Sequence, residues 1–248
     1  MPKKQKSLTT KVKVPIGFIV ITLVILVALI ITCVFLAKKL AEVDDDYQVS
    51  TPEQNESNDD GLIFKKPVVY LYPESETLIN VKLGAPNKLL VSYPAYPNDG
   101  WNVIANQDGV LKDLNTGREL YSLYYEAKNT FSNDIHEDGF VVKGTEVAVF
   151  LEEKLAELGL NEREAEEFII YWLPKMQDNA YNYIYFTTEE EVERNMPISV
   201  SPTPTTIIRI NMEWKALDAP IEVKTQTLPA TPERKGFTLV EWGGTILE

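Results

Sequence analysis

The chain has 248 residues and carries 24 Lys and Arg against 37 Asp and Glu, with a single His and a single Cys. One His and one Cys cannot supply the common zinc sites or an internal disulfide, and we expect no metal and no other cofactor. Seven of the basic residues but only one of the acidic residues lie in the first 43 positions, so the remainder has 17 basic and 36 acidic groups and a net charge of −19. This charge argues against nucleic acid as a partner.

The longest uncharged stretch runs over residues 14–37 and has the length of a transmembrane helix. Its 24 residues would rise about 1.5 Å each and cross a hydrocarbon core of roughly 30 Å. A cleaved signal peptide would have a shorter apolar run of about 7 to 15 residues and a small-residue cleavage site. A lipoprotein signal ending at Cys33 is a second alternative, but the apolar run continues beyond it. We expect an uncleaved anchor with Cys33 facing lipid, and acylation of Cys33 stays an alternative.

The charges on either side of this span predict its orientation. Five Lys lie in residues 1–13, whereas the two Lys after the span are followed at once by acidic residues. Because basic flanks stay on the cytoplasmic side, we expect a cytoplasmic tail at 1–13, a single pass through the cell membrane, and a C-terminal domain outside it. The lipid bilayer is therefore one expected partner.

An acidic linker is expected over residues 38–61. Its stretch 44–61 has seven acidic side chains and no basic ones, and it offers too little apolar surface to offset the entropy of ordering. From Leu62 onward the composition changes to Tyr, Val, Ile and Trp. The range 62–248 is long enough for one domain with a hydrophobic core.

This domain is predicted to be rich in strands. Residues 78–83 and 89–94 alternate apolar and polar side chains, and turn signals at 98–100 and 107–109 bracket a short strand at 101–105. The longest alternation is typical of a half-buried antiparallel strand and covers 206–217. Further strands are expected at 68–73, 119–127, 181–187, 221–227 and 236–242.

Two consecutive helices are expected in the middle of the domain. Apolar residues at helical spacing between Val147 and Leu158 predict the first, with Thr145 as its cap and Gly159 as its stop. Asn161 and Glu164 have the spacing of a capping box for the second helix, which Pro174 is expected to end. Strands, a helical hairpin and more strands predict an α+β fold with a mainly antiparallel sheet and an inserted helical hairpin.

Four segments of the domain resemble a family of uncharacterised, often membrane-anchored bacterial proteins. They are KPVVYLYPE at 66–74, the helical region 150–176, NYIYF at 182–186 and RKGFTLVEWGG at 234–244. The similarity covers nearly the whole range 62–248 and implies one intact domain. No activity, ligand or catalytic residue is attached to that family, so the resemblance implies nothing about mechanism.

Familiar enzyme signatures are absent from the sequence: it has no phosphate-binding Gly-rich loop with Lys, no dinucleotide fingerprint and no nucleophile elbow. His136 lies in a polar stretch, and we interpret it as a solvated loop residue rather than as part of a catalytic triad. Residues 134–139 resemble the first half of a calcium loop, but Thr145 stands where the bidentate Glu is needed. We interpret this segment as an acidic turn.

Two carboxylates are candidates for catalysis, Glu126 and Glu241. Each falls on an apolar, aromatic-rich face of a predicted strand, where its pKa would be raised. If both faced one cleft, they would suit acid/base hydrolysis of a glycosidic bond. Alternatively, Glu241 forms a structural ion pair with Arg209 or Arg234. The sequence does not decide whether the protein is an enzyme.

Aromatic side chains favour binding instead of catalysis. Trp101, Tyr124 and Trp242 are candidates for stacking on a sugar or for anchoring a protein partner, although packing in the core would also account for them. We expect a surface-exposed binding or interaction domain with a protein or glycan partner. The alternative is a carboxylate-dependent hydrolase that acts on cell-envelope glycan.

Overall fold

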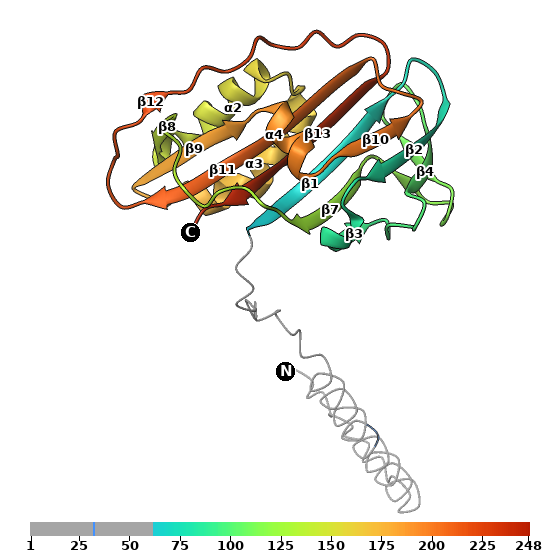
Figure 1. Cartoon of the computed structure of the whole chain (residues 1–248), viewed down its shortest axis with the longest axis horizontal. Helices are drawn as coiled ribbons and strands as arrows, with labels where there is room; N and C mark the ends of the chain where they lie inside the picture. The colour runs from blue at the N-terminus through green and yellow to red at the C-terminus, as the bar shows by residue number, and fades with distance from the viewer. Residues whose placement is uncertain (1–31, 33–61) are drawn as a thin grey trace, which may run out of the picture. The chain divides into compact units, whose positions relative to one another are not determined.

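The computed structural model describes Thr32 and residues 62–248 (Figure 1). The predicted tail at 1–13, span at 14–37 and linker at 38–61 lie outside this part of the chain, except for Thr32. None of the helices in the described part is both long and apolar enough to cross a membrane. Residues 62–248 belong to one compact unit.

The unit has an α+β fold with two mainly antiparallel sheets, which confirms the predicted class. The large sheet has the order β12-β8-β9-β11-β13-β1-β7-β3, and the small sheet has the order β10-β2-β4-β5-β6. The strands of the large sheet are β1 Ile63–Tyr72, β3 Leu89–Tyr93, β7 Leu123–Lys128, β8 Asp138–Lys143, β9 Tyr181–Thr187, β11 Thr206–Leu217, β12 Lys224–Thr225 and β13 Thr238–Ile246. Those of the small sheet are β2 Thr77–Leu83, β4 Trp101–Ala105, β5 Leu111–Asp113, β6 Glu119–Leu120 and β10 Ile198–Ser201. The helices are α2 Val147–Glu157, α3 Glu162–Met176 and α4 Glu189–Asn195, with 3-10 turns at Pro86–Lys88 and Gly144–Glu146.

The large sheet separates two hydrophobic cores. On one face α2 and α3 pack against it (Figure 1), and Trp172 of α3 joins Trp242 of β13 in the helix-side core. On the other face the small sheet and α4 build the sheet-side core, which contains Trp101. Side chains alternate along β1, so Tyr70 belongs to the helix side and Leu71 to the sheet side.

The centre of the large sheet holds a parallel pair, β11 and β13. Their register runs from Thr206 opposite Thr238 to Trp214 opposite Ile246. The connection over 218–237 contains no helix, and Figure 1 shows it running around one side of the sheet. The one strand in this connection is β12, whose two residues pair in parallel with β8. The predicted strand at 221–227 is therefore much shorter than expected.

The helical hairpin has the predicted stop between its helices and the predicted cap of α3, and it differs from the prediction in two details. Asn161 and Glu164 form the predicted capping box, and Gly159 has the positive φ of a helix stop, 96°. Thr145 makes no capping bond, because the chain enters α2 through the 3-10 turn. Pro174 lies inside α3 instead of ending it; burial of Met176 in the helix-side core holds the last turn.

Candidate functional site

The side chain of Glu241 is buried in the interior of the domain, where it is part of a structural ion pair. Its Oε2 accepts a hydrogen bond from Arg209 Nε at 2.5 Å, and its Oε1 accepts one from the Tyr125 hydroxyl at 2.6 Å. Burial and the charge of Glu241 raise the pKa of Tyr125 well above its ordinary value. Arg209 also pairs with Glu193 of α4. The predicted alternative of a pair with Arg209 is thus what the structure shows.

Glu126 lies on the opposite face of the sheet from Glu241. On β7 the Tyr125 side chain belongs to the sheet-side core with Glu241, whereas Tyr124 packs against the helix-side core. Alternation along the strand places Glu126 on the side of Tyr124. The two carboxylates therefore do not face one cleft, and this pair lacks the arrangement that two-carboxylate hydrolysis of a glycosidic bond needs.

Two of the three predicted binding residues are core residues. Trp101 and Trp242 are both 0 % exposed. The Trp101 indole donates to the Pro94 carbonyl at 2.9 Å, and the Trp242 indole donates to the Tyr70 hydroxyl at 3.1 Å. Because neither ring can reach a ligand, the prediction that they bind one is wrong. Filling a core without disulfides requires large side chains, and the buried indole nitrogens find partners there.

The remaining predicted residues, Tyr124 and Glu126, meet three residues that the sequence analysis missed. We call this group the Lys66 cluster; it consists of Lys66 on β1, Tyr124 and Glu126 on β7, and Tyr171 and Lys175 on α3. Lys66 sits at an irregularity in the register of β1, and among the described residues it is the one non-glycine with positive φ, 57°. Its backbone amide donates to Glu126 Oε1 at 3.1 Å. Such a left-handed backbone typically costs an L-residue about 1 to 2 kcal/mol.

Two ammonium groups of the cluster lie close to the same aromatic ring. Lys175 Nζ is 3.7 Å and Lys66 Nζ is 5.4 Å from the centroid of Tyr171. Desolvation, and after it the charge of Lys66, lowers the pKa of Lys175, while Glu126 opposes this shift. Burial and the charge of Glu126 raise the pKa of Tyr171 to about 12. The Lys66 cluster thus combines two cations, one carboxylate and two tyrosines, and each of these residues is at least partly exposed to solvent.

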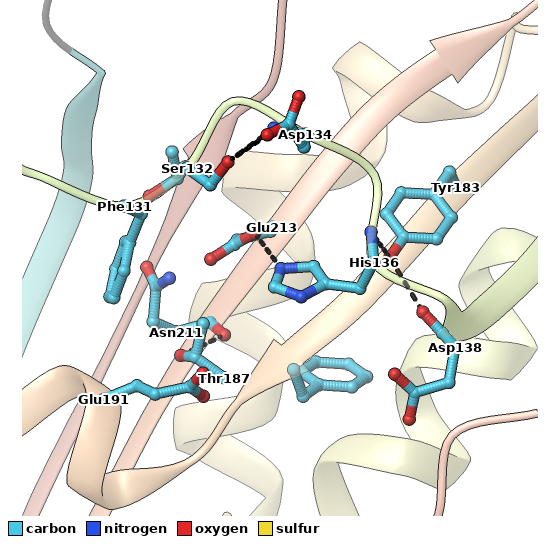
Figure 2. Close-up of polar contacts among 12 residues, drawn as sticks. Phe131, Ser132, Asp134, His136, Asp138, Tyr183, Thr187, Glu191, Asn211 and Glu213 are labelled. Atoms are coloured by element: carbon cyan, nitrogen blue, oxygen red, sulfur yellow. Dashed lines mark hydrogen bonds and ion pairs between the residues drawn. The ribbon is translucent and has the colours of Figure 1, made fainter.

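A second polar cluster occupies the other face of the large sheet, at β9 and β11 (Figure 2). His136 Nε2 lies 2.8 Å from Glu213 Oε2, and the side chain of Glu213 is only 1 % exposed. The imidazole stacks on Tyr185 with 3.8 Å between ring centroids, and the Tyr183 hydroxyl accepts from the His136 amide at 3.1 Å. Burial raises the pKa of Glu213, and the hydrogen bond and charge of His136 oppose this rise. His136 thus lies in a loop, as expected, but its side chain is paired and stacked instead of solvated.

Neighbouring side chains show that this second cluster is not a catalytic triad. The hydroxyl of Ser132 donates to Asp134 at 2.7 Å, as Figure 2 shows, and is not directed at the imidazole. Asn211 precedes Glu213 by two residues on the same strand, and its buried amide has no hydrogen-bond partner within the described part of the chain. The contact between His136 and Glu213 holds the loop against β11.

Neither similarity to known proteins nor a metal site identifies the domain. No family model, curated protein or solved structure matches the chain. Within residues 62–248 and Thr32, no three His, Cys, Asp or Glu side chains gather so that they could hold a metal ion. The resemblance to uncharacterised, often membrane-anchored bacterial proteins stays a prediction.

Proposed function

We propose that the chain is a single-pass membrane protein that holds a binding domain outside the cell membrane, and that this domain binds a small anionic ligand at the Lys66 cluster. The apolar length of 14–37 and the excess of Lys in 1–13 support the anchor and its orientation. The observation that carries the ligand proposal is the position of two ammonium groups at the single ring of Tyr171.

The charges of the cluster favour an anion of limited size. Lys66 and Lys175 repel each other, and the one carboxylate nearby, that of Glu126, already accepts the Lys66 amide. A carboxylate or phosphate between the two ammonium groups would form charge-assisted hydrogen bonds and neutralise them. The domain as a whole has 17 basic and 29 acidic side chains, and this field disfavours a long polyanion. A ligand with one anionic group fits both facts.

A titration of the full-length chain in detergent tests this function. The probes are glucuronate, glucose phosphate and, as the matched neutral sugar, glucose. Tryptophan fluorescence should respond, because the Trp172 ring lies 5.1 Å from that of Tyr171. We expect saturable binding of the two anionic sugars and none of glucose. If glucose binds equally well, or neither anionic sugar binds, the ligand proposal is wrong.

Variants locate the binding. Lys175→Met should weaken binding of the anionic sugars about tenfold or more, because a hydrogen bond to a charged group contributes about 1.5 to 3 kcal/mol. Lys224→Met is the matched control, since Lys224 is 78 % exposed and pairs with Glu137 at a distance from the cluster. This control should bind like the wild type. Equal losses in both variants would indicate a general charge effect instead of a site.

A further inference from the structure

A groove of about 850 Å³ runs along the outer edge of the large sheet, between β8, α2 and residues 221–225. Its volume lies in the range of known ligand sites. β12 covers β8 only at Asp138 and Gly139. The rest of β8 is a sheet edge with which no other strand of the described chain pairs on this side. This edge is separate from the Lys66 cluster, which is built on β1, β7 and α3.

Backbone groups of β8 face the groove. The amides of Lys224 and Gln226 donate to the carbonyls of Glu137 and Gly139 at 3.0 and 3.2 Å. Backbone direction alternates along a strand, so Val141 also directs its amide and carbonyl away from β9 and into the groove. A sheet edge with free donors and acceptors is a template for another strand.

The walls of the groove are apolar and acidic. Phe140, Val149 and Phe150 supply apolar surface, and Val149 is 59 % exposed. The charged side chains that line the groove are Glu146, Glu153 and Glu222, and no Lys or Arg lines it. Three carboxylates around an open strand edge complement a basic segment and repel an acidic one.

We propose that this groove binds an extended, basic peptide segment of a partner protein, which adds as a strand to β8. Main-chain hydrogen bonds to Val141 would supply affinity, as in other cases of strand addition. Apolar side chains of the peptide pack on Val149 and Phe150, and its Lys or Arg side chains reach the surrounding carboxylates. The proposal goes beyond small-ligand binding, because it concerns a different surface and a macromolecular partner.

Fluorescence anisotropy with the full-length chain in detergent tests the proposal. The probe is a short fluorescein-labelled peptide of alternating Lys and Val, and the matched peptide has Glu in place of Lys. Val141→Pro removes the amide that faces the groove and leaves the ladder to β9 intact, a change that edge strands tolerate. We expect the Lys peptide to bind, the Glu peptide not to bind, and Val141→Pro to weaken binding at least tenfold. Val141→Leu, which keeps the amide, should bind like the wild type.

Charge reversal gives a second, independent variant. Glu146→Lys combined with Glu222→Lys changes two exposed side chains, and it should abolish binding of the Lys peptide even if Val141→Pro fails to fold. Lys175→Met should leave this binding unchanged, which separates the groove from the anion site. Three results would overturn the proposal: no binding of the Lys peptide, equal binding of both peptides, or binding that the double charge reversal leaves intact. A dimer of the chain that Val141→Pro dissociates would place a second copy in the groove and also overturn it.

Discussion

Arg209 and Glu241 are direct neighbours across the parallel strands β11 and β13, and their side chains form a buried ion pair with 2.5 Å between Nε and Oε2. Their side chains are 1 % and 4 % exposed. A buried pair is not by itself a source of stability, but removing one partner leaves the other charge uncompensated, which typically costs about 3 to 5 kcal/mol. The pair therefore makes the domain sensitive to single substitutions at either position.

Glu241→Gln should lower the free energy of unfolding by about 3 to 5 kcal/mol. Urea unfolding followed by tryptophan fluorescence measures this, because all four Trp lie in residues 62–248. Glu193→Gln is the control: Glu193 contacts the same Arg209 but is 51 % exposed, and the loss should stay below about 1 kcal/mol. A Glu241→Gln protein that unfolds at the same urea concentration as the wild type, or a higher one, would return Glu241 to the candidates for catalysis.

Local features of this fold were predictable from sequence, and contacts between distant segments were not. The capping box of Asn161 and Glu164 needs only three residues of separation, and the alternation of 206–217 shows its strand directly. The pairing of Arg209 with Glu241 depends on the helix-free connection over 218–237, which no local pattern indicates. β8 was missed because its first residues resemble an acidic turn.

In the candidate site, too, local features were predictable from sequence and contacts between distant segments were not. Glu126 and Tyr124 were identified from the aromatic face of their strand. Lys66 lies 60 residues from Glu126 in sequence. Tyr171 belongs to a helix that was predicted from its apolar stripe, and that stripe does not include Tyr171. A pair of Lys at a β-strand start carries no signal of its own. Only the packing of α3 on the sheet brings the two ammonium groups together.

Residues 62–248 should fold as an isolated fragment, because they belong to one compact unit with both hydrophobic cores. The thermal midpoint of this fragment should not change with chelator or reductant, since its sequence contains no Cys and supplies no complete metal site. Circular dichroism during heating is the measurement. A midpoint that falls by several degrees with chelator would point back to residues 134–139 as a calcium site.

The contact between His136 and Glu213 predicts a stability that depends on pH. Burial raises the pKa of Glu213 above its ordinary value of 4.5. A carboxyl group with a raised pKa in the folded state stabilises the fold while it is protonated; this contribution is complete below pH 4.5 and is lost as the pH rises through the raised pKa. The hydrogen bond and the charge of His136 favour the ionised form of Glu213 and oppose this rise in its pKa.

His136→Gln should therefore lower the free energy of unfolding by about 1 to 3 kcal/mol at neutral pH, because the buried carboxyl group of Glu213 loses its contact with the imidazole. At about pH 4 the loss should be smaller, because an ordinary Glu is then largely protonated. In a protein that also carries Glu213→Gln, no charge is left at either position. The loss caused by His136→Gln should then be nearly the same at the two pH values. Urea unfolding at both pH values gives the comparison, and a loss that is independent of pH would contradict this account.

The orientation of the chain can be tested by cysteine labelling. Ser7→Cys and Ser57→Cys, each in a chain with Cys33→Ser, place one thiol on either side of the predicted span at 14–37. A membrane-impermeant maleimide applied to intact cells should label position 57 and not position 7, because the basic N-terminal flank is expected in the cytoplasm. Labelling at position 7 alone would place the C-terminal domain in the cytoplasm.

Lys66 allows strain and binding to be separated at one position. Its φ of 57° is unfavourable for every L-residue and free of penalty for glycine. Lys66→Gly should therefore raise the free energy of unfolding, by up to about 1 kcal/mol, whereas Lys66→Ala keeps the strained backbone and should not. Both variants keep the amide that donates to Glu126 and lose the ammonium group, so both should bind glucuronate about tenfold or more weakly than the wild type.

The comparison of these two variants shows whether Lys66 serves ligand binding or packing. A more stable Lys66→Gly protein with weakened binding would mean that the chain accepts a strained backbone to place an ammonium group beside Tyr171, as expected where strain accompanies function. If Lys66→Gly is as unstable as Lys66→Ala, packing of the lysine stem on the ring outweighs the strain. If glucuronate binds both variants as tightly as the wild type, Lys66 is not part of the anion site, whatever the stabilities show.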